Sequence, residues 1–358
     1  MKKWIIRLAL VGAFLSQQTL AQNALQDTDL TIDQAVRAEV IDGALRWLNL
    51  DYVFPEVAVR MEEAVREHAE MGKYDPITSA REFAEMLTTN LQDVSGDKHV
   101  RVVFSIPIPF GAEPTTEPKD SQGSFYSQRN YGFEKVERLA GNVGYLDLRF
   151  FSFPGRQVRE TAAGAMNFLA NVDALIIDLR QNRGGLADTV ALISSYLFGP
   201  EPVHLNDIYN RFSGETKESW TLPDVAGKRL TDVDVYILTS NVTFSAAEAF
   251  AYSLKHLERA TIVGEATGGG AHTGGPYRIN AHFSVNVPSG RAINPITGTN
   301  WEGVGVQPDV EVSADKALAT AHLLALEDRV SEMRDPRIRA ESVAAVERLR
   351  EQVREEPD

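Results

Sequence analysis

The spacing of apolar residues divides the chain into a helical N-terminal part and a core in which strands and helices alternate. From Leu30 to Leu91, apolar residues recur every three or four positions, which predicts three helices. At Val100 the spacing changes to the alternation that is typical of a strand. The stretch 111–128 is rich in Pro, Thr, Ser and Gly and is predicted to be a loop.

After this loop the predicted elements follow a strand–helix rhythm. The predicted strands cover 142–151, 174–179, 235–239 and 261–263, and the predicted helices cover 156–170, 186–198 and a segment that begins at Ser245. Residues 277–287 alternate like one arm of an antiparallel hairpin, and the chain from 314 onward is predicted to be helical. The sequence therefore predicts an α/β fold with a helical N-terminal subdomain and a helical C-terminal tail.

The domain boundaries are placed where the pattern changes. They are a signal peptide (1–21), a helical N-terminal subdomain (22–99), a strand and linker (100–140), an α/β core (141–325) and a charged helical tail (326–358). No internal repeat is present in the sequence.

The N-terminus has the order of a secretory signal peptide. Three basic residues within the first seven precede an apolar run at 8–15, and small residues lead to a cleavage site expected after Ala21. The run is too short to cross a bilayer, and no later segment reaches about 18 apolar residues. We expect a periplasmic or secreted protein without a stable membrane span after cleavage; a retained anchor is the alternative.

Charge and composition exclude several function classes. The 358 residues carry a net charge of -14 and form no stripe of Lys and Arg, so neither nucleic acid nor an anionic membrane surface is an expected partner. The absence of cysteine excludes disulfides, a thiol nucleophile and cysteine metal sites. The seven histidines show no spacing typical of a metal site, and we expect no metal and no cofactor.

The segment VYILTSNVTFSAAEAFAYSL is the most informative one in the chain. It predicts a buried strand, a short turn and a helix that opens at Ser245. At the start of a helix, unpaired N–H groups and the positive end of the dipole favour negative charge. A serine nucleophile needs such a place because its attack creates an oxyanion. The residues Ser245 to Glu248 also form a capping box, which begins many ordinary helices.

Three further segments carry polar residues that the apolar pattern does not explain, namely 95–99, 178–185 and 300–309. Together with the Ser245 turn they resemble the tail-specific, or C-terminal processing, serine protease family. The chain is most similar to the branch that contains the tricorn protease core and the repeats of interphotoreceptor retinoid-binding protein. The resemblance rests on six motifs in order: YVFPE, SGDKHVRV, DLRQNRGG, TFSAAEAFAYSL, VGEATGGGAH and WEGVGVQPD.

The resemblance implies a ClpP/crotonase-like core of ββα-type units and hydrolysis of peptide bonds in a peptide or protein substrate. By position, Ser245 matches the nucleophile, His99 the histidine that acts as base and then as acid, and Glu302 the glutamate of the catalytic tetrad. The family's oxyanion hole matches the Gly184-Gly185 turn and the backbone N–H of Ala246.

The chain departs from the family pattern in three places. The turn GEATGGGAH has no lysine, so a Ser–Lys dyad is not supported. Only about forty residues separate His99 from Val143, too few for the PDZ domain that many processing proteases carry. Lys98 stands where the tricorn pattern has a serine; it is a candidate supporting residue, and its like charge is expected to lower the pKa of His99.

Two alternatives stay open. Glu265 and His272 flank the glycine-rich turn and are alternative candidates for the site, although His272 is expected to be an ordinary loop histidine. The alternative function is a noncatalytic module that binds a hydrophobic ligand such as a retinoid or a fatty acid, as the retinoid-binding repeats imply.

Overall fold

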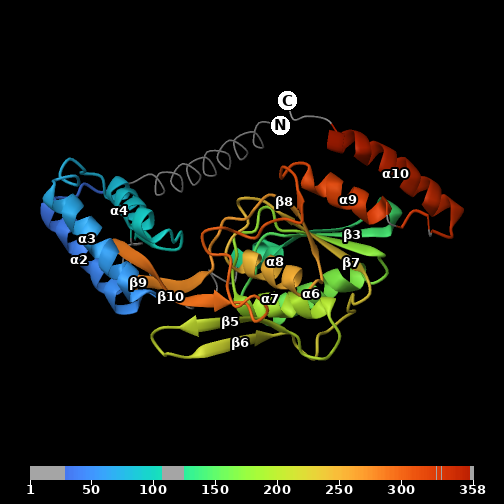
Figure 1. Cartoon of the computed structure of the whole chain (residues 1–358), viewed down its shortest axis with the longest axis horizontal. Coiled ribbons are helices and arrows are strands. Elements are labelled where there is room, and N and C mark those ends of the chain that lie inside the picture. The colour runs from blue at the N-terminus through green and yellow to red at the C-terminus, as the bar shows by residue number, and fades with distance from the viewer. Residues whose placement is uncertain (1–28, 107–124, 328, 332, 355–358) are drawn as a thin grey trace, which may run out of the picture.

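The computed structural model describes residues 29–106, 125–327, 329–331 and 333–354. The predicted signal peptide and most of the predicted loop at 111–128 lie outside the described residues. A helical N-terminal region and an α/β body lie at opposite ends of the molecule, and a long strand passes from one to the other (Figure 1). None of the described helices combines the length and apolarity needed to cross a membrane.

The helical region contains the three predicted helices, and each begins at a sequence signal. Asp33 caps the first by accepting a hydrogen bond from the N–H of Val36, Pro55 opens the second, and Ser79 caps the third through the N–H of Glu82. Gly96, with φ 69°, ends the third helix. The helices are α2 (Gln34–Asp51), α3 (Pro55–Glu70) and α4 (Ala80–Ser95).

The body is built on a six-stranded sheet in the order β11-β8-β7-β4-β3-β2. In this sheet β3, β4, β7, β8 and β11 are parallel to one another, and β2 is antiparallel to β3. Their bounds are β2 (Phe133–Leu139), β3 (Val143–Leu148), β4 (Ala174–Asp178), β7 (Asp234–Thr239), β8 (Thr261–Gly264) and β11 (Val310–Glu311). The α/β class, the helical N-terminal region and the helical tail are confirmed.

Helices cover both faces of this sheet, which explains why β4 is apolar up to its last residue, Asp178. Leu175 and Ile177 of β4 pack toward α6 (Arg156–Phe168), α7 (Ala187–Ser194) and α8 (Ala246–His256). Ala174 and Ile176 face the other side, where α9 (Ala317–Glu327) and α10 (Pro336–Arg354) lie (Figure 1).

A second sheet joins the helical region to the body. In it β10 (Phe283–Ile293) pairs with β1 (Arg101–Phe104), β9 (His272–Arg278) and β5 (His204–Asn210), and β5 pairs with β6 (Thr216–Trp220). Val285 packs in the core of the helical region, whereas Ala292 packs in the core of the body. The domain boundaries stay predictions, because β10 belongs to both parts.

The prediction of one continuous strand at 277–287 is wrong. The chain reverses direction between β9 and β10, so these residues belong to both arms of a hairpin. The side chain of Asn280 accepts hydrogen bonds from the N–H groups of His282 and Phe283 and thereby forms the turn. The predicted helix 186–198 is also shorter, because α7 continues only as a short 3-10 turn at 195–197.

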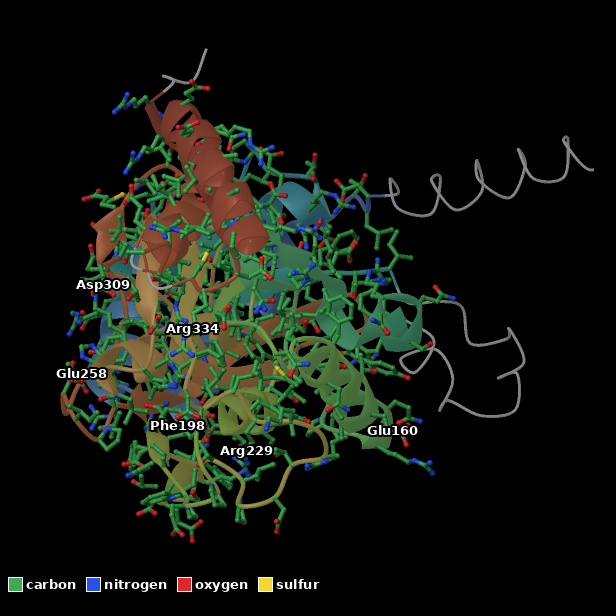
Figure 2. The ribbon with its side chains drawn as sticks, turned by 90° about the vertical axis from the view of Figure 1, so that its right-hand side faces the viewer. Glu160, Phe198, Arg229, Glu258, Asp309 and Arg334 are labelled. Carbon is green, nitrogen blue, oxygen red and sulfur yellow. The ribbon has the colours of Figure 1, made fainter. Side chains whose placement is uncertain are left out.

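A half-buried arginine, Arg229, holds the irregular segment before β7 in place. The guanidinium of Arg229 donates hydrogen bonds to the carbonyl oxygens of Phe198 and Gly199, both at 2.9 Å, and Figure 2 shows Arg229 close to Phe198. It also donates to the carbonyls of Leu222 and Pro223. The side chain of Arg229 therefore supplies hydrogen bonds to backbone carbonyl groups that lie outside the sheets.

An aromatic pair connects α8 to the turn at Gly184 and Gly185. Phe250 of α8 is fully buried and lies against Phe151, with ring centroids 5.6 Å apart. The N–H of Phe151 donates to the carbonyl of Gly184 (2.9 Å), and its carbonyl accepts from the N–H of Leu186 (3.0 Å). The position of Ser245, one residue before α8, relative to the glycine turn thus depends on this packing.

Replacing Phe250 with alanine is expected to lower the free energy of unfolding by about 3–5 kcal/mol, because it removes a fully buried ring and leaves a cavity. Urea titration followed by circular dichroism measures the change. The control is Phe212→Ala, whose side chain is 81% exposed and whose loss is expected to change stability by less than about 0.5 kcal/mol. Equal unfolding midpoints for the two variants would contradict this account of the core.

Candidate functional site

Ser245 occupies a strained position between β7 and α8. It is the N-cap of α8 but has φ 56° and ψ -119°, a conformation that residues other than glycine rarely adopt. Such strain persists only where the surrounding structure enforces it, and it clusters at functional sites. The N–H of Ser245 donates to the carboxylate of Glu248 at 2.8 Å, as a capping box requires. Ser245 is therefore both a helix cap and an unusually constrained serine.

The carboxylate of Glu248 ties the Ser245 turn to the glycine-rich turn. It is fully buried and also accepts hydrogen bonds from the N–H groups of Gly269 (2.6 Å) and Gly270 (2.9 Å) and from the hydroxyl of Thr267 (2.5 Å). Burial raises the pKa of Glu248, and these hydrogen bonds oppose the rise. Ser245 and Gly270 share the same oxygen atom, Oε2, so their backbones lie next to each other.

His99 reaches this pair of turns from the junction between the helical region and β1. Its ring lies against the ring of Phe244, the residue before Ser245, with centroids 4.6 Å apart. A Cβ atom added at Gly270 would lie 2.7 Å from Cε1 of His99 and 2.3 Å from the ring of Phe244. Only glycine at position 270 leaves room for the imidazole. The structure thus places His99 beside the residues that flank Ser245.

The pKa of His99 is lowered, chiefly by burial, while the nearby Asp97 carboxylate raises it and His272 and Arg101 lower it. The expected cause, the charge of Lys98, is wrong. The ammonium group of Lys98 instead donates a hydrogen bond to the carbonyl of Gly268 at 2.5 Å. Lys98 therefore helps to hold the glycine-rich turn.

The Gly184-Gly185 turn packs directly against the serine. A Cβ atom at Gly184 would lie 2.8 Å from Cβ of Ser245, and one at Gly185 would lie 2.0 Å from the carbonyl oxygen of Phe151. The φ angles of 107° and 140° also require glycine at both positions. The N–H of Gly184 donates to the side chain of Asn182 at 2.9 Å and is therefore engaged within the turn.

Two backbone N–H groups near Ser245 remain without an acceptor in the described part of the chain. They belong to Gly185 and to Ala246, the first residue of α8. The N–H of a first helical residue has no acceptor within its own helix. Two such donors beside one hydroxyl form an arrangement that can bind a negatively charged oxygen.

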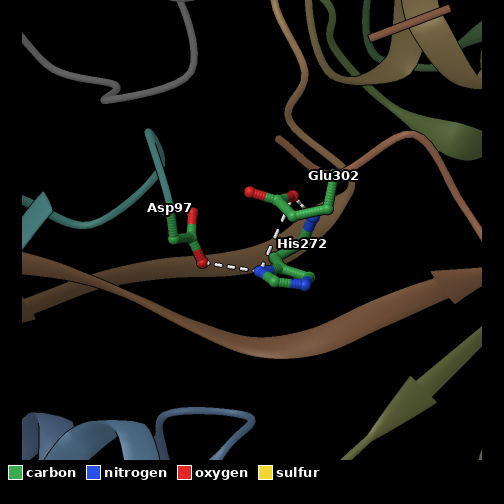
Figure 3. A group of neighbouring side chains, drawn as sticks. All are labelled: Asp97, His272 and Glu302. Atoms are coloured by element: carbon green, nitrogen blue, oxygen red, sulfur yellow. Dashed lines mark hydrogen bonds and ion pairs between the residues drawn. The ribbon is translucent and has the colours of Figure 1, made fainter. Parts of the chain in front are cut away.

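A cluster of the buried Asp97 and His272 and the half-buried Glu302 adjoins the site (Figure 3). Nδ1 of His272 is hydrogen-bonded to Asp97 Oδ2 at 2.6 Å. Glu302 Oε2 accepts from the N–H groups of Ala271 (2.5 Å) and His272 (3.1 Å), and it lies 3.6 Å from Nδ1 of His272. The loop role expected for His272 is therefore wrong, because this histidine is buried at the start of β9.

Glu302 contacts His272 in this cluster, and no hydrogen bond or ion pair joins it to His99 within the described residues. Burial, together with the charge of Asp97, raises the pKa of Glu302 to about 7, although His272 and two backbone N–H groups oppose the rise. The other alternative, Glu265, lies elsewhere: its carboxylate accepts from the N–H groups of Asn241 and Ala314, both at 3.1 Å.

By residue type, the cluster could hold a divalent cation, since one ligand atom of each residue lies within 4.8 Å of the others. However, Nδ1 of His272, both oxygens of Asp97 and Oε2 of Glu302 already take part in hydrogen bonds inside the chain. We therefore interpret the cluster as a hydrogen-bond network.

Ser245 opens into a cavity with mainly apolar walls. Ser245, Gly185, Ala246 and His272 line it together with Trp301. Its apolar lining comes from small and branched side chains, namely Ala187, Val190, Leu205, Ile208, Ala249 and Ala292. His99 lines a second cavity with Phe244, Lys98, Arg101 and Arg183.

Both parts of the chain match domain models of peptidase family S41. The model of peptidase family S41 matches residues 142–312. A model described as the N-terminal domain of peptidase S41 in eukaryotic IRBP matches residues 21–139.

Curated relatives share part of the chain. Over 247 residues it is 26% identical to carboxyl-terminal-processing peptidase 1, chloroplastic, of Arabidopsis thaliana, covering 65% of this chain and 49% of that protein. Over 134 residues it is 35% identical to the carboxyl-terminal-processing protease of Synechocystis sp., covering 37% of this chain and 29% of that protein. The chain thus spans about half, or less, of the length of these relatives.

Solved structures share the fold over most of the chain. A putative peptidase from Parabacteroides merdae superposes with a TM-score of 0.58 at 19% identity, covering 81% of this chain and 96% of that chain. A lipoprotein from Streptococcus agalactiae gives a TM-score of 0.55 at 16% identity, covering 82% of this chain and 96% of that chain. Similarity at this low identity shows a common fold.

The raised pKa of Glu302 predicts a specific pH dependence of stability. Between its usual pKa of 4.5 and about 7, the folded protein keeps a proton on Glu302 that the unfolded chain has released. The contribution of Glu302 to stability therefore falls as the pH rises through this window. Glu302→Gln, which does not titrate, is expected to become more stable relative to wild type across the window, by up to about 3 kcal/mol.

Urea unfolding of wild type and Glu302→Gln at several pH values between about 4 and 8 measures this difference. Glu85→Gln, at an exposed position on α4, is the control and is expected to show no comparable trend. A difference between wild type and Glu302→Gln that does not change with pH would contradict the prediction.

Proposed function

The chain belongs to peptidase family S41, and from this premise we propose that it is an exported serine peptidase that hydrolyses peptide bonds by acyl transfer. One observation carries the proposal. Ser245 is held in a strained turn at the start of α8, beside two backbone N–H groups without acceptors among the described residues, and the half-buried His99 packs against the preceding residue, Phe244. These are the parts that acylation of a serine requires.

In the proposed mechanism, Oγ of Ser245 attacks the carbonyl carbon of the scissile bond while His99 accepts the hydroxyl proton. The N–H groups of Gly185 and Ala246 stabilise the oxyanion of the tetrahedral intermediate. Gly184 shapes the turn, because its own N–H is bonded to Asn182. His99 then donates the proton to the leaving amine, and water hydrolyses the acyl-enzyme by the same steps. Glu302 supports this network without taking part in bond making.

A histidine base is favoured over a lysine base. Lys98 is bonded to the carbonyl of Gly268, and Lys255, near the end of α8, forms an ion pair with Asp309 at 2.7 Å. A side chain at position 270 of the glycine-rich turn would collide with His99. The imidazole therefore occupies space that a side chain at position 270 would need.

The proposed substrate is a peptide or protein with an apolar side chain near the scissile bond, because the cavity beside Ser245 has mainly apolar walls. The same walls favour the second candidate, a noncatalytic module for a hydrophobic ligand. The names of the curated relatives describe processing at carboxyl termini. We propose the same activity for this chain.

A fluorophosphonate probe is expected to label the purified protein, since it reacts with activated serines. Ser245→Ala is expected to abolish labelling, and His99→Ala is expected to slow it by about 10²–10⁴-fold. The control is Ser219→Ala, which removes another hydroxyl from the wall of the same cavity. Labelling that persists in Ser245→Ala would refute the nucleophile. Saturable binding of a fluorescent fatty acid by a protein that does not label would favour the second candidate.

We also propose export to the periplasm or the medium. The expected cleavage after Ala21 predicts that the mature protein begins at Gln22. Mass spectrometry of the protein purified from the periplasm or medium of an expressing bacterium determines its N-terminus. The variant Ala21→Arg is expected to block cleavage and to retain the precursor, because the cleavage site requires a small residue. A mature protein that still begins at Met1 would refute the proposal.

A further inference from the structure

We propose that Asp97, held in place by His272 and Tyr52, is the carboxylate that orients the imidazole of His99, and that Glu302 acts on His272 rather than on His99. This inference rests on the proposed function, in which His99 is the base. It assigns positioning roles to Asp97, His272 and Glu302, none of which touches the reacting atoms.

Asp97 is the carboxylate that pairs with His99 in the described part of the chain. Its Oδ1 accepts the backbone N–H of His99 at 2.9 Å and lies 3.8 Å from Nδ1 of the same imidazole. Nδ1 of His99 is buried and has no hydrogen-bond partner among the described residues. A buried nitrogen without a partner needs an explanation. Shortening of this 3.8 Å separation on substrate binding, when catalytic contacts tighten, would make Asp97 the partner of Nδ1.

The other oxygen of Asp97 is held from two sides. Oδ2 is bonded to Nδ1 of His272 at 2.6 Å and accepts a hydrogen bond from the hydroxyl of Tyr52 at 3.1 Å. Asp97 has no exposed surface, so its negative charge requires such partners. His272 and Tyr52 therefore satisfy this oxygen and fix the direction of the carboxylate, leaving Oδ1 for His99.

Glu302 is joined to this network through His272. It accepts the backbone N–H groups of His272 and Ala271 and lies 3.6 Å from Nδ1 of His272. It thereby fixes the start of β9, from which the imidazole of His272 extends to Asp97 (Figure 3). The chain of contacts runs from Glu302 to His272, to Asp97 and then to His99.

The role of Asp97 in catalysis follows from proton transfer. When His99 takes the serine proton on Nε2, the ring becomes a cation, and an adjacent carboxylate stabilises it and fixes its tautomer. No net proton transfer to Asp97 is required. The other ionisable groups near His99 are Arg101, His272 and, in the same cavity, Lys98 and Arg183, and none of these can carry a negative charge. Asp97 therefore supplies the negative charge that favours the protonated ring.

The test compares Asp97→Asn and Tyr52→Phe with wild type in peptide hydrolysis and fluorophosphonate labelling. Asp97→Asn is expected to lower kcat by about 10²–10⁴-fold with little change in KM, because Asp97 does not line the substrate cavity. The acidic limb of the kcat/KM profile, which reports His99, is expected to move to lower pH. Tyr52→Phe is expected to lower kcat by a smaller factor, of about 10-fold. The proposal would be overturned if Asp97→Asn kept the kcat of the wild type and the acidic limb of its kcat/KM profile did not move.

Two matched controls separate positioning from folding. Tyr74→Phe removes a buried hydroxyl that bonds to Asn90 inside the helical region, and it is expected to leave kcat unchanged. His272→Asn retains an N–H donor at the position of Nδ1 and is expected to keep most activity, whereas His272→Leu retains bulk without the donor and is expected to lose it. Full activity in His272→Leu would overturn the role of His272. An active His99→Ala with an inactive His272→Leu would show that His272 is the base.

A measurement without catalysis distinguishes this inference from the proposed function. The NMR titration of the His99 Cε1–H signal gives the pKa of His99 in wild type and in Asp97→Asn. Loss of the carboxylate charge is expected to lower that pKa. If the wild type does not label or hydrolyse peptides but the pKa shifts, the proposed function fails and the Asp97–His99 coupling stands. If the enzyme is active but the pKa does not shift, the coupling fails alone. Should Asp97→Asn not fold, Tyr52→Phe and the two His272 variants decide the role of the network.

Discussion

The buried carboxylate of Glu248 is the interaction on which the rest of the site depends. One oxygen accepts the N–H groups of both Ser245 and Gly270, and the other accepts Gly269 and Thr267, so two turns far apart along the chain are held in contact. A buried carboxylate needs several donors, and the turns can supply them only in this arrangement. The strained Ser245 and Gly270, which leaves room for His99, are therefore held by the same oxygen atom.

The site also depends on how the helical region joins the body. Ser245 comes from the body, whereas His99 and Asp97 come from the end of the helical region, and the long strand β10 packs into the cores of both. The carbonyl of His99 accepts a hydrogen bond from the side chain of Asn286 in β10 at 2.6 Å. Small shifts between the two parts would therefore change the distance between base and nucleophile, since the proposed base is carried by neither α8 nor the central sheet.

Local signals in the sequence predicted much of the fold and part of the site. The apolar run of β4, the periodic apolar spacing of the three N-terminal helices and the helix start at Ser245 were all predicted, because each depends on residues close in sequence. The strands β5 and β6 were not predicted, since both carry many polar and partly exposed residues and show no clear alternation. The hairpin turn at Asn280 was missed because one side chain, rather than a glycine or proline, forms it.

The sequence by itself determined that a serine stands at a helix start, and family motifs pointed to His99, Glu302 and the Gly184-Gly185 turn. Only the tertiary structure decided which groups these side chains meet. The bond between His272 and Asp97 joins residues 175 positions apart, and no local periodicity reports such a contact. The structure likewise placed Glu302 against His272 and left the N–H of Gly185, rather than that of Gly184, without an acceptor among the described residues. Hydrogen bonds act over about 3 Å in space, whereas sequence patterns describe neighbours along the chain.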